Sequence, residues 1–111
     1  MKEIVNLTPH PVKIILANDI TLEFPPSEQP ARANEKRIKN DEVEYNQFCI
    51  PVNEVQLGDV KNLPEPNPDT IYIVSRIVAD ACPDRNDLYI PDETVRDNEG
   101  NIKGCRALAQ V

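Results

Sequence analysis

Ser75 and Arg76 are the adjacent residues with the clearest capacity for chemistry in this sequence. They follow residues 70–74, a short apolar run rich in β-branched side chains that predicts a buried strand. A serine at that point is typical of a helix N-cap, and residues 77–81 supply an apolar helical side that Pro83 ends. Because a helix start has free amides and a positive dipole, the pair predicts a receptor for a small anion. The alternative is that Ser75 is only a structural cap.

Thr8 and His10 lie in a turn, residues 8–11, in which two prolines restrict the backbone around the chain's one histidine. That histidine has three candidate roles: a structural residue whose ring caps backbone groups, a ligand contact, or an acid–base group. Arg32 sits between two alanines, which suits a guanidinium drawn inward to pair with a phosphate or with one of the chain's carboxylates. We expect Thr8 and His10 to line the wall of the anion site, and Arg32 to join Arg76 in neutralising the ligand.

The cysteines and carboxylates form no recognisable catalytic or metal-binding motif. The cysteine count is odd and no CxxC spacing occurs, which predicts reduced thiols rather than disulfides or a structural zinc site. The cysteines are Cys49, Cys82 and Cys105. The carboxylates, including Asp80, Asp84 and Asp87, are scattered and predict a solvated acidic face, although a glycosidase-like pair stays open. No calcium-loop, HExxH or Walker pattern is present, so we assign no catalytic residue, no metal ligand and no cofactor.

Composition narrows the class of protein. A chain of 111 residues with 40% hydrophobic residues predicts one globular domain, residues 1–111. The 12 basic and 19 acidic residues give a net charge of −7, which argues against partners such as long nucleic acid or an anionic membrane surface. No apolar run is long enough to cross a bilayer, and residues 1–10 do not resemble a signal peptide. We therefore expect a cytoplasmic location.

The hydrophobic pattern predicts mostly strands with stiff connections. The 11 prolines against three glycines indicate long rigid loops. Expected strands cover residues 3–7, 12–16, 20–24, 31–38, 44–52, 70–74, 88–91 and 101–108. The first two should form a hairpin, the first three an antiparallel meander, and residues 53–69 a long irregular region. Together these features predict an α+β fold: a mixed, mostly antiparallel sheet with one short helix and long proline-rich loops.

Several motifs along the chain resemble a family of small uncharacterised proteins found in phages, prophages and bacteria. The motifs are Asn6-Leu7-Thr8-Pro9-His10-Pro11-Val12, Pro25-Pro26 with Ala31-Arg32, Ile73-Val74-Ser75-Arg76, Val95-Arg96-Asp97 and Gly104-Cys105-Arg106-Ala107-Leu108. The resemblance covers nearly the whole chain. It implies a phage or mobile-element accessory protein, of the kind that acts by binding, for example by sequestering a nucleotide signal of a host defence system.

Three hypotheses for function follow. The first is a non-enzymatic binding protein for a small anionic, nucleotide-like ligand with an anti-defence role, its ligand-binding residues being Thr8, His10, Arg32, Ser75 and Arg76. The second is a protein-interaction or inhibitor module with a protein partner, which predicts an exposed apolar patch or free strand edge within residues 44–52. The third is a small hydrolase or lyase acting on a nucleotide or sugar through His10 or a carboxylate. We expect a binding protein rather than an enzyme, and leave a homo-oligomer open.

Overall fold

A computed structural model describes residues 2–111, with the side chain of Asp19 left undescribed. The described residues form eight strands, one α-helix and one short 3-10 helix. In chain order these are β1 (Glu3–Asn6), β2 (Val12–Ile15), the 3-10 helix η1 (Ala17–Asp19), β3 (Thr21–Phe24), β4 (Arg32–Tyr45), β5 (Phe48–Lys61), β6 (Thr70–Ile73), α1 (Arg76–Ala81), β7 (Leu88–Arg96) and β8 (Ile102–Ala109). No helix in this part of the chain is both long enough and apolar enough to cross a bilayer.

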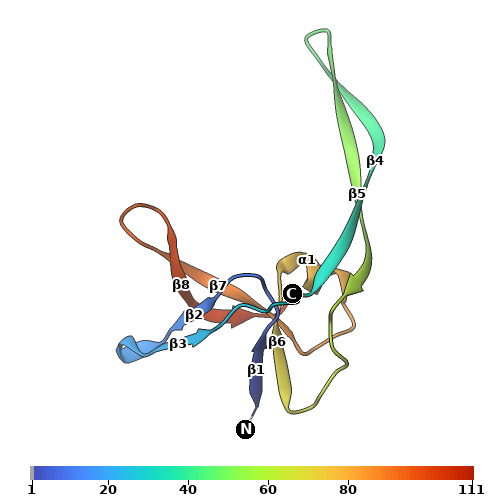
Figure 1. Cartoon of the computed structure of the whole chain (residues 1–111). Coiled ribbons are helices and arrows are strands. Elements are labelled where there is room, and N and C mark those ends of the chain that lie inside the picture. The colour runs from blue at the N-terminus through green and yellow to red at the C-terminus, as the bar shows by residue number, and fades with distance from the viewer. Residues whose placement is uncertain (1) are drawn as a thin grey trace.

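Six strands form one mixed sheet in the order β1-β6-β7-β8-β2-β3 (Figure 1). Neighbours pair in parallel at β1/β6, β6/β7 and β2/β8, and antiparallel at β7/β8 and β2/β3. The predicted mixed sheet and single short helix are confirmed. Three strand pairs of this sheet are parallel and two are antiparallel, so the sheet is more evenly mixed than expected. The fold is mostly β, and the α+β label describes it only loosely.

The first three strands do not form the predicted meander. β2 and β3 pair as expected, but β1 pairs with β6 instead of β2. The reason lies in the turn at residues 8–11, which carries the chain from one part of the sheet to another instead of folding β2 back onto β1. Long-range pairing with β6 extends past β1, because the Leu7 amide donates to the Ile73 carbonyl at 2.8 Å.

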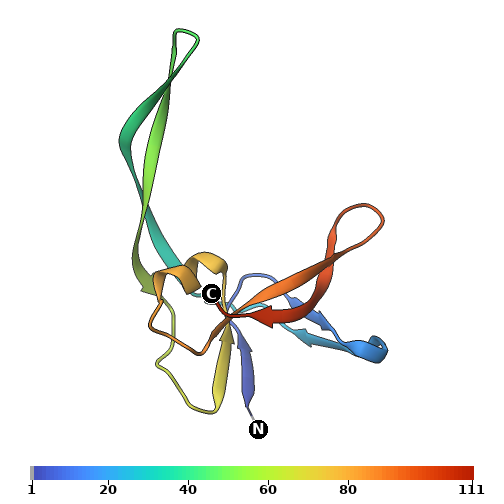
Figure 2. The same cartoon turned by 180° about the vertical axis from the view of Figure 1, so that it is seen from behind.

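β4 and β5 form a separate two-stranded ribbon, called the arm below, that projects from the body in both views (Figures 1 and 2). Two predictions are wrong here. Residues 44–52 are not one strand, because a turn at Asn46 and Gln47 divides them, and regular structure continues to Lys61 instead of ending near residue 53. Both turn residues have positive φ, 46° and 74°, as a tight hairpin requires. The usual Asn-Gly signal is missing because the second position is Gln47.

Two hydrophobic clusters hold the body together. The larger one comprises Leu7, Ala31, Tyr72, Val74, Val78, Ala79 and Leu88, and Ala33 and Val60 at the base of the arm pack against it. The smaller one comprises Val12, Ile14, Ile73 and Cys105. Consecutive residues Ile73 and Val74 belong to different clusters, as expected for a strand whose side chains alternate between two buried faces.

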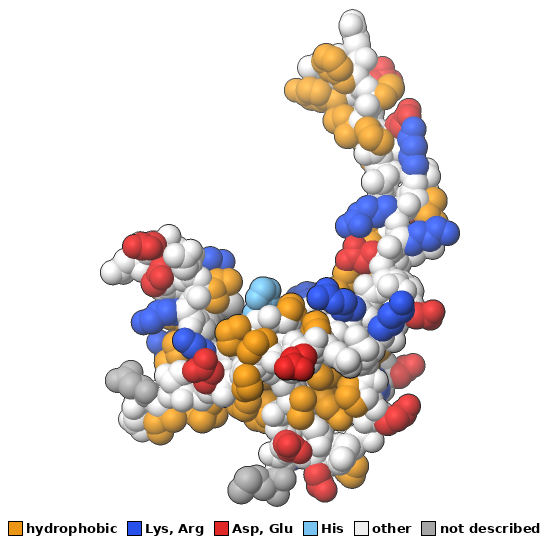
Figure 3. Space-filling model, in the orientation of Figure 1, with side chains coloured by type: hydrophobic (Ala, Val, Ile, Leu, Met, Phe, Trp, Pro, Cys, Tyr) orange, Lys and Arg blue, Asp and Glu red, His pale blue; other side chains and the backbone are white. Residues whose placement is uncertain are grey.

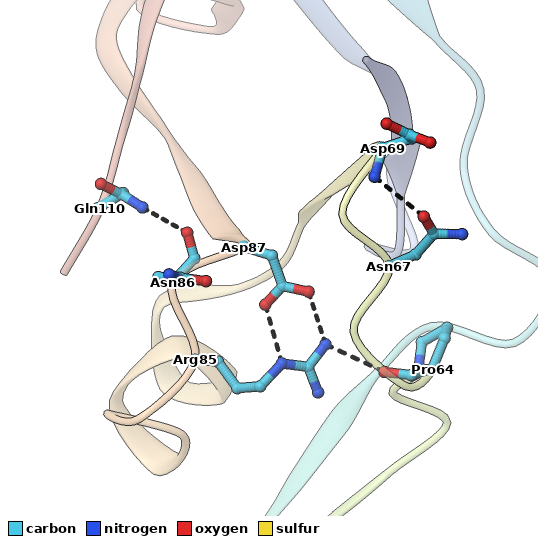
Figure 4. A network of polar contacts seen from close by, with 7 residues as sticks. All are labelled: Pro64, Asn67, Asp69, Arg85, Asn86, Asp87 and Gln110. Atoms are coloured by element: carbon cyan, nitrogen blue, oxygen red, sulfur yellow. Dashed lines mark hydrogen bonds and ion pairs between the residues drawn. The ribbon is translucent and has the colours of Figure 1, made fainter.

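A partly buried ion pair connects the segment before β7 to the loop before β6 (Figure 4). The Arg85 guanidinium donates from Nε and Nη2 to the two carboxylate oxygens of Asp87, each at 2.8 Å, and Nη2 also donates to the Pro64 carbonyl at 3.1 Å. These hydrogen bonds hold the pKa of Asp87 below its ordinary value and raise the pKa of Arg85. Asp87 therefore does not belong to the solvated acidic face that the sequence predicted.

Candidate functional site

A groove of about 680 Å³ lies where the turn at residues 8–11 meets the start of α1 and the strands β7 and β8. Its walls are largely aliphatic and prolyl: Pro9, Pro11, Val12, Ile90, Pro91 and Ile102. Figure 3 shows the chain's one histidine exposed on the hollowed side of the molecule, between the arm and the rest of the body. Apolar walls with a few polar groups are typical of small-molecule sites.

Four of the five candidate residues meet at this groove, although they come from distant parts of the chain. Thr8 and His10 approach from the turn after β1, and Ser75 and Arg76 from the junction of β6 and α1. Arg32 does not join them: it begins β4, opposite Lys61, and its side chain is exposed. Its flanking alanines do not draw it inward, because Ala31 and Ala33 point to the core while strand alternation turns Arg32 away.

Asn6 holds the turn that presents Thr8 and His10, and sequence analysis gave it no role. The Asn6 side chain is buried, and its Nδ2 donates to the carbonyls of His10, Phe24 and Pro25 at 2.8, 3.2 and 3.1 Å. Its Oδ1 accepts from the Thr8 amide at 2.9 Å and lies 2.7 Å from the Thr8 hydroxyl. The Thr8 hydroxyl is therefore engaged within the turn, and Thr8 shapes the wall more than it contacts a ligand.

His10 is exposed, and no hydrogen bond joins its ring to another residue within 2–111, while its carbonyl accepts from Asn6 Nδ2 and lies 2.9 Å from the Thr8 hydroxyl. The turn is thus built by the His10 backbone. The structure therefore does not show the structural role considered for His10, in which its ring caps backbone groups. The imidazole is left facing the groove, where it is available to a ligand.

The start of α1 differs from the capped helix end that the sequence predicted. Ser75 occupies the N-cap position with extended φ and ψ of −71° and 156°, but its side chain makes no capping hydrogen bond. The helix has only six residues, so its dipole contributes little to an anion site. Arg76 is well exposed, with Nε 3.8 Å from the Asp80 carboxylate one turn later, a loose pair that a ligand is able to replace.

Lys13 and Asp92 also line the groove, and sequence analysis missed both. Lys13 lies on β2 between buried Val12 and Ile14, so strand alternation could have indicated that it points outward, but not that β8 and α1 would lie nearby. The groove therefore has two permanent cations, Lys13 and Arg76, against one carboxylate. The lining residues alone carry one net positive charge within a chain of net charge −7, and Asp80, the loose partner of Arg76, offsets it until a ligand replaces that pair.

The one thiol in the groove lining is poorly suited to nucleophilic chemistry. Cys105 is buried, and its Sγ lies 3.5 Å from the Lys13 carbonyl. Desolvation raises the pKa of this thiol above its ordinary value, so the reactive thiolate is disfavoured. All three cysteines are free thiols, as the sequence predicted, and Cys49, at the far end of the arm, is exposed.

The fold and site together define a mostly β protein with an open, largely apolar groove carrying two cations, and with a projecting two-stranded arm. Comparisons of the chain with protein-family models, with curated proteins and with solved structures found no match.

Proposed function

We propose that the protein is a non-enzymatic binding protein for a small anionic ligand that the groove holds. The observation that carries the proposal is the convergence of Arg76, Lys13, His10 and Ser75 on apolar walls in an otherwise acidic chain. The two cations would neutralise the anionic group, and the prolines and aliphatic residues would cover the rest of the ligand.

A nucleotide-like ligand, which the resemblance to phage proteins implies, is the first class to test. None of the chain's tyrosines or phenylalanines is among the groove-lining residues, so a base would rest on proline and aliphatic surfaces. Phosphate recognition would then contribute more to affinity than base stacking. The resemblance to phage proteins extends the proposal to a cytoplasmic, anti-defence role in which the protein sequesters such a ligand.

Calorimetric titration with inorganic phosphate and a panel of mono-, di- and cyclic nucleotides tests the proposal. Arg76→Ala should weaken binding by about 1.5–3 kcal/mol, roughly 10- to 150-fold, which is the range for a hydrogen bond to a charged group. Arg32→Ala is the matched control, because it removes the same charge from an exposed position outside the groove. Equal losses in the two variants, or no heat with any ligand, would refute the proposal.

A second candidate function, a protein-interaction module, is favoured by the arm. The far part of the arm exposes several large apolar side chains within and beside residues 44–52, where the sequence predicted an interaction patch. Those residues lie outside the groove lining, so the two functions involve separate surfaces. Pull-down from a host lysate with and without Tyr45→Ser would test this function, and a set of captured proteins unchanged by the substitution would contradict it.

A further inference from the structure

One face of the arm's distal half is apolar and exposed. Cross-strand partners in an antiparallel pair point to the same side, and the register pairs Tyr45 with Phe48 and Val43 with Ile50. Val52 follows on the same side of β5 by strand alternation. We call these residues, Val43, Tyr45, Phe48, Ile50 and Val52, the distal face. Tyr45 and Phe48 are 63% and 70% exposed, and Figure 3 shows apolar side chains gathered toward the end of the arm.

Nothing in the chain itself covers this face. The arm is a sheet of two strands, and it packs on the body at its base, beside α1. The radius of gyration is 17.6 Å, against about 13 Å for a compact domain of this length. A two-stranded ribbon alone is at best marginally stable in water, and it needs a further surface to pack on. On β4, Val43 and Tyr45 alternate with Glu42 and Glu44, which is the pattern of a strand with one buried face.

We propose that a second copy of this chain covers the distal face, so that two arms pack face to face around a two-fold axis. This inference deepens the interaction-module proposal and is independent of ligand binding in the groove. A two-fold pair requires a self-complementary surface, and the apolar distal face, which Asp41 borders opposite Val52, satisfies that requirement.

The area of the face places the dimer at the lower limit of specific interfaces. Aromatic side chains bury about 150–250 Å² each, so the exposed parts of Tyr45 and Phe48 present on the order of 250 Å². The three aliphatic residues bring the face to roughly 400 Å². Two such faces supply about 800 Å², and the flanking polar side chains raise the total toward the ~1,000 Å² that a specific interface needs.

The charges along the arm favour an antiparallel arrangement of the two copies. Beyond residue 39 the arm carries three acidic side chains and no basic one, namely Asp41, Glu42 and Glu44, and Glu42 pairs with Lys39 of the same arm at 2.6 Å. Nearer the body it carries five basic and three acidic side chains; the basic ones are Arg32, Lys36, Arg37, Lys39 and Lys61. When two arms overlap in opposite directions, the acidic end of each approaches the basic part of the other, which offsets repulsion between two acidic molecules.

The test is the mass of the full chain in solution, measured by sedimentation and by light scattering over a wide concentration range in reducing buffer. The wild type should approach twice 12.5 kDa as concentration rises. The variant Tyr45→Ser/Phe48→Ser should remain at the mass of one chain. Because some substitutions could disturb the arm, Val43→Thr/Ile50→Thr provides a second variant of the same face, with the same expected loss of the dimer.

The control is a residue at the adjacent register position, on the opposite side of the arm. Cys49→Ser changes no charge and should leave the dimer intact. A wild type that stays at 12.5 kDa at every concentration would overturn the inference, as would a dimer that survives both distal-face variants. A monomer that captures a different protein through Tyr45 and Phe48 would overturn self-pairing while supporting the broader interaction-module proposal.

Discussion

Replacing Asn6 with alanine is the substitution that should most affect the groove without touching its lining. Asn6 is 6% exposed, and its side chain makes several hydrogen bonds that hold the turn before β2. The change removes both Nδ2 hydrogens, which three carbonyls share, and the oxygen that accepts from the Thr8 amide. The turn then keeps its prolines but loses the side chain that holds its carbonyls together.

The size of the effect follows from these contacts. A neutral hydrogen bond contributes about 0.5–1.5 kcal/mol net, and a buried group left without a partner costs about 1–3 kcal/mol. The Thr8 hydroxyl offsets part of the loss, because it lies 2.9 Å from the His10 carbonyl and is able to donate there instead. We expect Asn6→Ala to lower the free energy of unfolding by about 3 kcal/mol, a large share of the 5–15 kcal/mol typical of a domain.

Urea unfolding followed by far-UV circular dichroism gives the required comparison, provided that the slope with denaturant is the same for all variants. Thr8→Val removes only the hydroxyl and should cost about 1 kcal/mol. Asn67→Ala is the matched control, since the Asn67 side chain accepts one exposed hydrogen bond, from the Asp69 amide at 2.9 Å. The reasoning would be refuted if Asn6→Ala cost no more than either of these two changes.

Two further predictions concern the body of the protein. Arg85 lowers the pKa of Asp87 below its ordinary value of 3.8, so the Asp87 carboxylate binds a proton more readily in the unfolded state than in the folded state. The contribution of the ion pair to stability is therefore complete above pH 3.8 and is lost as the pH falls through the folded-state pKa. The stability gap between wild type and Asp87→Asn, measured by urea unfolding at a series of pH values, should therefore narrow below pH 3.8, and a constant gap would contradict the assignment. Gly104→Ala should lower the stability of the folded protein by about 1–3 kcal/mol, because the added Cβ would lie 2.9 Å from the Lys13 carbonyl on β2. Gly58→Ala is the control, because its added Cβ would have its nearest contact at 3.5 Å and should leave stability nearly unchanged. Thermal unfolding of both variants measures the difference.

The sequence determined the elements whose signals are local. Residues 70–91 were predicted as strand, helix and strand because a β-branched run, a helix-capping serine position and Pro83 act within a few residues of each other. β6, α1 and β7 appear there, although β7 runs on to Arg96. The hairpin between β7 and β8 followed from Glu99-Gly100, and Gly100 has the positive φ of 85° that such turns favour.

Tertiary structure alone decided which strands pair and which side chains meet. Parallel pairing of β1 with β6 joins segments more than 60 residues apart, and hydrophobic alternation is the same whichever neighbour a strand receives. Sequence analysis assigned Arg32 to the groove and missed Lys13 for the same reason. Both are cations beside apolar residues, and only the strands that fold next to them distinguish the two. The Asn46-Gln47 turn shows a further limit: without a glycine, the closing of the arm depends on the long ladder of β4 and β5.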